Sequence, residues 1–198
     1  MRPLLLLSLA AAAHAAPDSR IVLRDNWTLT SSAGGPTYRI AAPSTVFSAL
    51  VAHGVYPDPY FGMNLRSAPG VSYAIGTMFA NQAMPPGSPF HCAWRYRTEF
   101  RLPADFAGKT VRLGFDGINF RANLTLNGKP IAAKEQFAGA WRLFEFDVTA
   151  AVKPGAANEL VVDVFPPEPG DLAITFVDWN PMPPDKMMGI WRDVWIAA

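Results

Sequence analysis

The amino-acid sequence predicts an all-β fold, an antiparallel β-sandwich with one short helix. Apolar and polar residues alternate with a period of two in several short segments between residues 94 and 165, as in strands with one buried face. Turn residues separate these segments, and the chain contains 19 Pro and 15 Gly. Strands do not alternate with long helical patterns, so a parallel sheet is not expected.

Strand and helix signals occur in the first half of the chain. Residues 27–30 (Trp-Thr-Leu-Thr) are typical of a strand. Apolar residues at roughly helical spacing predict a short helix over residues 45–53. Ser44 or Thr45 can cap its beginning, and Gly54 can end it. Residues 55–89 are irregular, and so long a loop in a compact domain is usually functional or poorly ordered.

The clearest strand signal covers residues 94–102, and the same period predicts strands over residues 111–115, 119–126, 144–148 and 160–165, with Asn119 and Arg121 on the polar side of the second of these. Asn127-Gly128 predicts a tight hairpin turn, with a return strand over residues 129–136. Near the end of the chain, the apolar run 172–177 and the run 191–196 are predicted as strands on either side of a Pro-rich loop.

Composition limits the kinds of function. The chain has 198 residues, half of them hydrophobic, and a formal net charge of +1, which suits one sizeable folded core. It has no basic face or Lys/Arg run, so no nucleic-acid partner is predicted. Cys92 is the single cysteine and excludes an internal disulfide. Together with His53 and His91 it gives no zinc-site spacing, and we predict no metal or cofactor.

The first 15 residues predict a cleavable signal peptide. Arg2 precedes an apolar run over residues 4–13 that is too short to span a bilayer. Ala13-His14-Ala15 then supplies the small residues that a signal peptidase reads. We therefore expect a secreted or periplasmic protein, not held in a membrane after processing, whose folded domain comprises residues 16–198.

The Pro-rich loop carries the candidate binding residues Asp178, Trp179 and Asn180. A flat aromatic ring can cover the C–H face of a sugar, and carboxylate or amide groups can bind its hydroxyls. Packing is the competing interpretation, in which Trp179 lies under the loop and Asp178 accepts from backbone N–H groups. Asn64, in the loop over residues 56–64, is a further candidate, against a loop that only covers the sandwich edge. The residues alone favour packing in both loops.

The sequence alone names no catalytic residue. Its 16 acidic residues fall mostly at polar strand positions or in turns, where solvation explains them. No Ser/His/Asp arrangement, phosphate-binding loop or metal-ligand cluster is recognisable.

Six stretches resemble, in order, the N-terminal sugar-binding domain of glycoside hydrolase family 2. They are residues 94–100 (WRYRTEF), 115–122 (FDGINFRA), 126–129 (LNGK), 144–149 (FEFDVT), 158–162 (NELVV) and 189–194 (GIWRDV). Within the family, residues 56–64 and 171–185 look most like exo-β-D-glucosaminidases and related β-mannosidase-type enzymes.

This resemblance implies a jelly-roll, galactose-binding-domain-like sandwich. In the family an immunoglobulin-like domain and a TIM barrel follow, and the barrel carries the two catalytic carboxylates. The catalytic residues are therefore expected outside this chain. The family's loop that matches Asp178 and Trp179 helps to line the site for the terminal sugar, and Asn180 and Asn64 are weaker candidates. The expected partners are a carbohydrate ending in β-linked glucosamine or mannose and the two absent domains.

Two alternatives stay open at this point. One is a stand-alone carbohydrate-binding module without catalysis, and the other is a fragment that only packs against absent domains. A large apolar patch around Ile190 and Trp191 would favour absent neighbouring domains.

Overall fold

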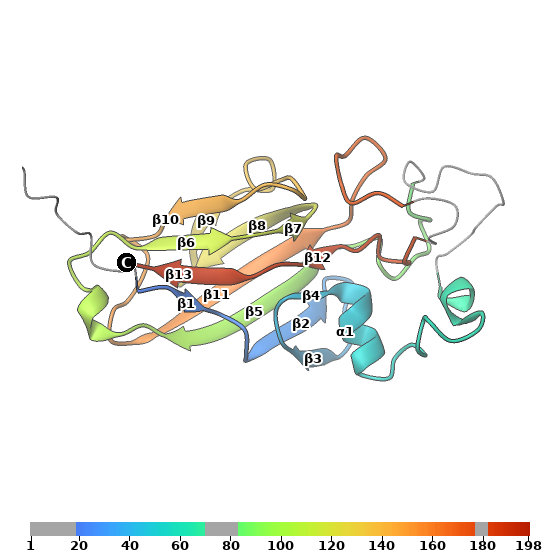
Figure 1. Ribbon diagram of the computed structural model, residues 1–198, viewed down its shortest axis with the longest axis horizontal. Coiled ribbons are helices and arrows are strands. Elements are labelled where there is room, and N and C mark those ends of the chain that lie inside the picture. The colour runs from blue at the N-terminus through green and yellow to red at the C-terminus, as the bar shows by residue number, and fades with distance from the viewer. Residues whose placement is uncertain (1–18, 70–82, 177–181) are drawn as a thin grey trace, which may run out of the picture.

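The protein is a β-sandwich in the computed structural model, which describes residues 19–69, 83–176 and 182–198. Figure 1 shows the two larger sheets as layers, with the helix and the long loops gathered toward one end. All strand pairs in the described ranges are antiparallel, so the predicted fold class is confirmed. The predicted signal peptide, residues 1–15, lies outside the described residues.

The strands form three sheets. The four-stranded sheet has, in spatial order, β1 (Ile21–Val22), β13 (Val194–Ala197), β6 (Arg112–Phe115) and β10 (Phe144–Asp147). The six-stranded sheet has β3 (Thr37–Ile40), β2 (Trp27–Ser31), β5 (Trp94–Arg101), β11 (Ala157–Phe165), β8 (Arg121–Leu126) and β9 (Lys129–Ala132). The third and smallest sheet has β4 (Ser44–Thr45), β12 (Gly189–Ile190) and β7 (Ile118–Asn119).

The core fills the space between the two larger sheets. On β5 and β11 every second residue turns inward, as the period of two predicts. From the four-stranded side, Phe115 and Phe144 each lie 4.8 Å from Phe137 between ring centroids. Phe137 comes from the connection between β9 and β10 and is fully buried. These contacts join the connection to the sandwich.

The predicted helix is α1, Val46–Ala52. Thr45 and Ser48 form a capping box, since the Thr45 hydroxyl accepts from the Ser48 N–H at 3.3 Å and Ser48 Oγ accepts from the Thr45 N–H at 3.1 Å. Gly54 follows the helix at φ +70°, the conformation that favours glycine there. Sequence therefore predicts both the helix and its ends. Two short 3-10 helices, η1 (Asn64–Ser67) and η3 (Ala104–Phe106), complete the described elements.

Three strand predictions are wrong in part. Residues 172–176 form no strand, because Leu172 is 86% exposed and the Ile174 N–H bonds to a side chain, that of Asn119, instead of a strand partner. Of the predicted run 191–196, only residues 194–196 form a strand, and this strand, β13, extends to Ala197. The return strand over 129–136 ends at Ala132, where a turn begins. The period of two fails in the final run because β13 is buried on both faces.

A substitution at Gly189 tests how closely the small sheet is packed. It has φ +140°, and a Cβ there would lie 2.4 Å from Tyr96 Oη and 2.8 Å from Thr45 Cα. We therefore expect Gly189→Ala to lower the free energy of unfolding by about 3 kcal/mol, through overpacking and backbone strain. Urea denaturation measures this change. Gly87→Ala is the matched control, because nothing lies within 4 Å of its Cβ position. Equal stability of the two variants would contradict this view of the small sheet.

Candidate functional site

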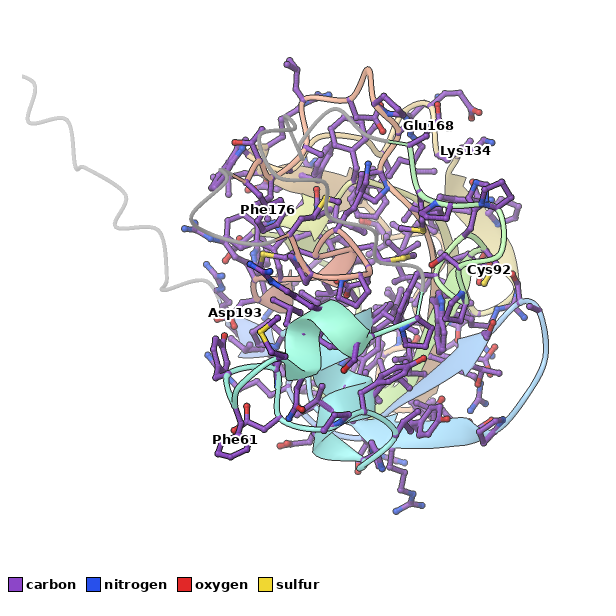
Figure 2. The ribbon with its side chains drawn as sticks, turned by 90° about the vertical axis from the view of Figure 1, so that its right-hand side faces the viewer. Phe61, Cys92, Lys134, Glu168, Phe176 and Asp193 are labelled. Carbon is purple, nitrogen blue, oxygen red and sulfur yellow. The ribbon has the colours of Figure 1, made fainter. Side chains whose placement is uncertain are left out.

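The candidate site lies at the end of the sandwich where residues 166–176 and 182–188 meet helix α1. Figure 2 looks onto this end of the molecule, with Phe176 left of the centre and Phe61 at the lower left. The predicted site residues Asp178, Trp179 and Asn180 lie outside the described residues. The structure describes the chain on both sides of residues 177–181. We call residues 166–176 the first flank of this loop and residues 182–188 its second flank.

Asn119, the last residue of β7, contacts both flanks of this loop. Its side chain is fully buried. Asn119 Nδ2 donates to the Lys186 carbonyl at 2.9 Å and to the Met187 carbonyl at 3.1 Å. Asn119 Oδ1 accepts from the Ile174 N–H at 3.4 Å. A buried amide with these partners fixes the separation of the two flanks, because each unmade contact would leave a polar group without water.

Arg121, on β8, holds the first flank through a pair of carboxylates. One guanidinium nitrogen donates to Glu168 Oε1 at 2.9 Å, and the other donates to Asp171. The other oxygen of Asp171 accepts from the Glu168 N–H at 2.8 Å. The Arg121 and Asp171 side chains are only 19% and 9% exposed. Solvent therefore screens this ion pair less than a surface pair.

Asp185 joins the second flank to the helix. Its fully buried carboxylate accepts from the Phe47 N–H, in the first turn of α1, at 2.7 Å and from the Met187 N–H at 2.9 Å. Burial raises the pKa of Asp185 to about 6, while the two backbone N–H groups favour the charged form and limit the rise. Tyr96 is also buried beside it and donates to the Ser44 carbonyl at 2.9 Å.

Lys186 follows directly and is 4% exposed, at φ +52°. Burial lowers the pKa of its ammonium group, and the charge of Asp171 acts in the opposite direction. We call Asn119, Arg121, Asp171, Asp185 and Lys186 the loop frame.

Asn64 has a different place. It begins η1, and its Nδ2 donates to the Asp58 carbonyl at 2.9 Å, while Asp58 Oδ1 accepts from the Tyr60 N–H at 2.9 Å. Asn64 therefore orders its own loop. Across the described ranges no hydrogen bond is found between it and the loop frame.

The loop frame was not predicted from the sequence. The alternation over residues 119–126 predicts Asn119 and Arg121 on the wet face of one strand, but Asn119 is fully buried. It belongs to the separate strand β7, where it pairs with Gly189 of β12. A polar residue between Ile118 and Phe120, both apolar, is the one available signal of such a buried amide.

The loop frame is suited to holding a loop and not to acid–base chemistry. Both of its carboxylates are engaged by backbone N–H groups or by Arg121. Among the described residues, no group of three or more His, Cys, Asp or Glu side chains is placed to hold a metal ion. No helix in the described ranges is long and apolar enough to cross a membrane.

Comparison with known proteins gives consistent results. Residues 90–175 match the family model described as the glycosyl hydrolase 2 galactose-binding domain-like. The chain is 31% identical over 194 residues to an exo-β-D-glucosaminidase of Amycolatopsis orientalis, and 26% identical over 227 residues to a β-mannosidase of Rattus norvegicus. It superposes on the crystal structure of an Amycolatopsis orientalis exo-chitosanase with a TM-score of 0.72 and 28% identity.

These matches cover nearly all of this chain and a small share of its relatives. The matched regions span 93% of this chain and 17% of the glucosaminidase, and 98% of this chain and 23% of the mannosidase. For the crystal structure the shares are 91% and 20%. The chain thus spans about a fifth of the length of the proteins that it matches.

Asp185 predicts a pH dependence of stability. Its folded pKa of about 6 lies above its ordinary value of 3.8, so its contribution is fully present below pH 3.8 and is lost as the pH rises through 6. The difference of about two pKa units corresponds to about 3 kcal/mol. We expect the stability difference between the wild type and Asp185→Asn to shrink by about this amount from pH 4 to pH 7.

Urea denaturation at four pH values measures this difference. Asp163→Asn serves as the control, because Asp163 forms a surface ion pair with Arg95. A wild-type-minus-Asp185→Asn difference that stays constant with pH would show that Asp185 does not titrate in this range.

Proposed function

The chain belongs to glycoside hydrolase family 2, as its galactose-binding-domain-like N-terminal domain, and we propose that it is the non-catalytic, sugar-contacting domain of an exported glycosidase. The complete enzyme would remove a terminal β-linked glucosamine or mannose from a glycan. Similarity along nearly the whole chain to an exo-β-D-glucosaminidase and to a β-mannosidase supports these two substrate classes.

The observation that carries the proposal is the loop frame. Asn119 binds both flanks of residues 177–181, and Asp171 and Asp185 fix one flank each. A loop with fixed ends loses less conformational entropy when it binds a ligand than a loop with free ends. The indole of Trp179 would then cover the apolar face of a terminal sugar, while Asp178 and Asn180 bind its hydroxyls.

Catalysis is proposed to reside elsewhere in the enzyme. Glycoside hydrolysis with retention needs two carboxyl groups about 5 Å apart on either side of the glycosidic bond. The carboxylates of the loop frame are occupied by structural contacts, which supports a positioning role for this domain. We assign the two catalytic carboxylates to a TIM barrel and propose that an immunoglobulin-like domain lies between the barrel and this chain.

The first 15 residues bear on where the enzyme acts. We infer that residues 1–15 direct the chain out of the cytoplasm and are then removed, so that the protein acts as a secreted or periplasmic enzyme. A polymeric glycan outside the cell is a substrate that such a location would make accessible.

Activity and binding separate the possible roles. We expect the chain alone to show no hydrolysis of p-nitrophenyl β-D-glucosaminide or β-D-mannoside, because no catalytic carboxylate pair is assigned to it. Release of p-nitrophenolate, followed by absorbance, measures this. Turnover that disappears in Asp178→Ala would overturn the non-catalytic assignment.

We expect weak binding of glucosamine or mannose, with a Kd near a millimolar, because the other walls of the sugar pocket lie on other domains. Isothermal titration calorimetry should show this binding weakened about tenfold in Trp179→Ala and unchanged in Phe61→Ala, which alters an aromatic side chain elsewhere at the same end. Binding to oligosaccharides alone, unaffected by Trp179→Ala, would favour a stand-alone binding module. Complete absence of binding would favour a purely structural domain.

A further inference from the structure

Trp195 and Trp191 each lie against a glycine in or just after β6, and Trp141 contacts Trp191. A Cβ on Gly114 would lie 2.0 Å from the Trp195 ring, and a Cβ on Gly117 would lie 2.7 Å from the Trp191 ring. Both glycines therefore leave room for an indole that lies directly against the backbone. Trp141, in the connection between β9 and β10, meets Trp191 edge to face, with 5.0 Å between ring centroids and 80° between planes.

Arginine side chains cover two of the three tryptophan rings. The Arg20 guanidinium lies 4.5 Å from the Trp195 ring centroid, and Trp195 Nε1 donates to Asp116 at 2.8 Å. Trp195 is only 9% exposed. The Arg192 guanidinium lies 4.7 Å from the Trp191 ring centroid. These cations cover the rings and leave them little free surface.

Trp141 differs because its ring is open. Its side chain is 68% exposed, and in the described part of the chain no cation lies over it. Trp191 nevertheless holds the ring in place. Trp191 Nε1 donates at 3.1 Å to the carbonyl of Ala140, the residue before Trp141. An indole that is both fixed and exposed can stack on a ligand with little loss of conformational freedom.

We propose that Trp141 is a stacking platform for one pyranose ring of a neutral β-linked glycan. A β-linked pyranose carries axial C–H groups that fit the face of an indole, and its hydroxyls need donors and acceptors at the rim. Arg142 and Arg192 flank Trp141 and Trp191 in the chain and supply such donors. Arg142 is positioned by the Ala138 carbonyl, at 3.1 Å from its Nη1, and by the Phe144 ring, at 4.9 Å from its guanidinium carbon. This platform does not depend on the proposed function of the loop.

The exposed area fits a sugar better than a neighbouring protein domain. Within residues 137–143, Trp141 and Leu143 are the two exposed large apolar side chains, and Leu143 is 72% exposed. Ile190 is fully buried and adds nothing to the surface. Two such side chains offer at most about 400 Å² of apolar surface, which is no more than the largest apolar patch of a typical monomer.

The charge beside Trp141 favours neutral glycans over positively charged ones. Arg142 and Arg192 form no ion pair within the described ranges. Two uncompensated guanidinium groups beside the platform would repel a glycan of protonated amino sugars. A neutral glycan, such as one whose amino groups are acetylated, meets no such repulsion.

Two probes that differ only in charge test this proposal with the full chain: the β-1,4-linked hexamer of N-acetylglucosamine and its deacetylated form. Isothermal titration calorimetry at pH 6 should show binding of the acetylated hexamer and at least tenfold weaker binding of the deacetylated one. Trp141→Ala should weaken binding of the acetylated hexamer about tenfold, and Trp141→Phe less, because a smaller aromatic face remains.

A control variant keeps this test specific to Trp141. Phe61→Ala removes another exposed aromatic side chain, 75% exposed, and should leave hexamer binding unchanged. Loss of hexamer binding in Trp179→Ala but not in Trp141→Ala would overturn the platform while supporting the loop. Absence of hexamer binding at millimolar concentration would also overturn it. So would self-association in analytical ultracentrifugation that Trp141→Ala abolishes, because the platform would then be a protein contact.

Discussion

The carboxamide of Asn119 connects β7 to two segments that lie more than 50 residues further along the chain. It comes from β7, accepts a hydrogen bond from Ile174, and donates to the carbonyls of Lys186 and Met187. Buried side-chain amides are stable only when they are hydrogen-bonded, so this residue requires both flanks to be where they are. Asp171 and Asp185 then attach each flank to the sandwich, one through Arg121 on β8 and one through the first turn of α1.

The sheets provide what these polar contacts need. β7, β12 and β4 form a small separate sheet whose packing around Gly189 leaves no room for a side chain. This sheet places Asn119 next to Gly189, close to where the second flank ends. The apolar core thus supports the loop only indirectly, and the immediate support is polar and buried. In our proposal the flanks stay fixed by these polar contacts, and the residues of the loop itself contact the sugar.

Local sequence patterns predicted the elements that depend on local physics. The alternation over residues 94–102 and 160–165 gave β5 and β11, and the capping residues gave helix α1 with both ends. The same patterns misplaced Asn119 and residues 172–176, because their conformation is set by partners more than 50 residues away. Local patterns likewise do not tell that Trp141 is exposed while guanidinium groups lie over Trp191 and Trp195. The predicted loop residues Asp178, Trp179 and Asn180 lie outside the described residues.

Asn119 holds the two flanks of the loop in place, and hydrogen–deuterium exchange of Asn119→Ala tests this role most directly. We predict about tenfold faster exchange in residues 172–176 and 182–188, with β5 and β11 as protected as in the wild type, because the loss of a buried hydrogen bond destabilises mainly the groups that it joins. Asn123→Ala is the matched control, since Asn123 Oδ1 accepts only from the Lys134 N–H among the described residues, at 2.8 Å. Unchanged exchange in both flanks of Asn119→Ala would contradict the claim.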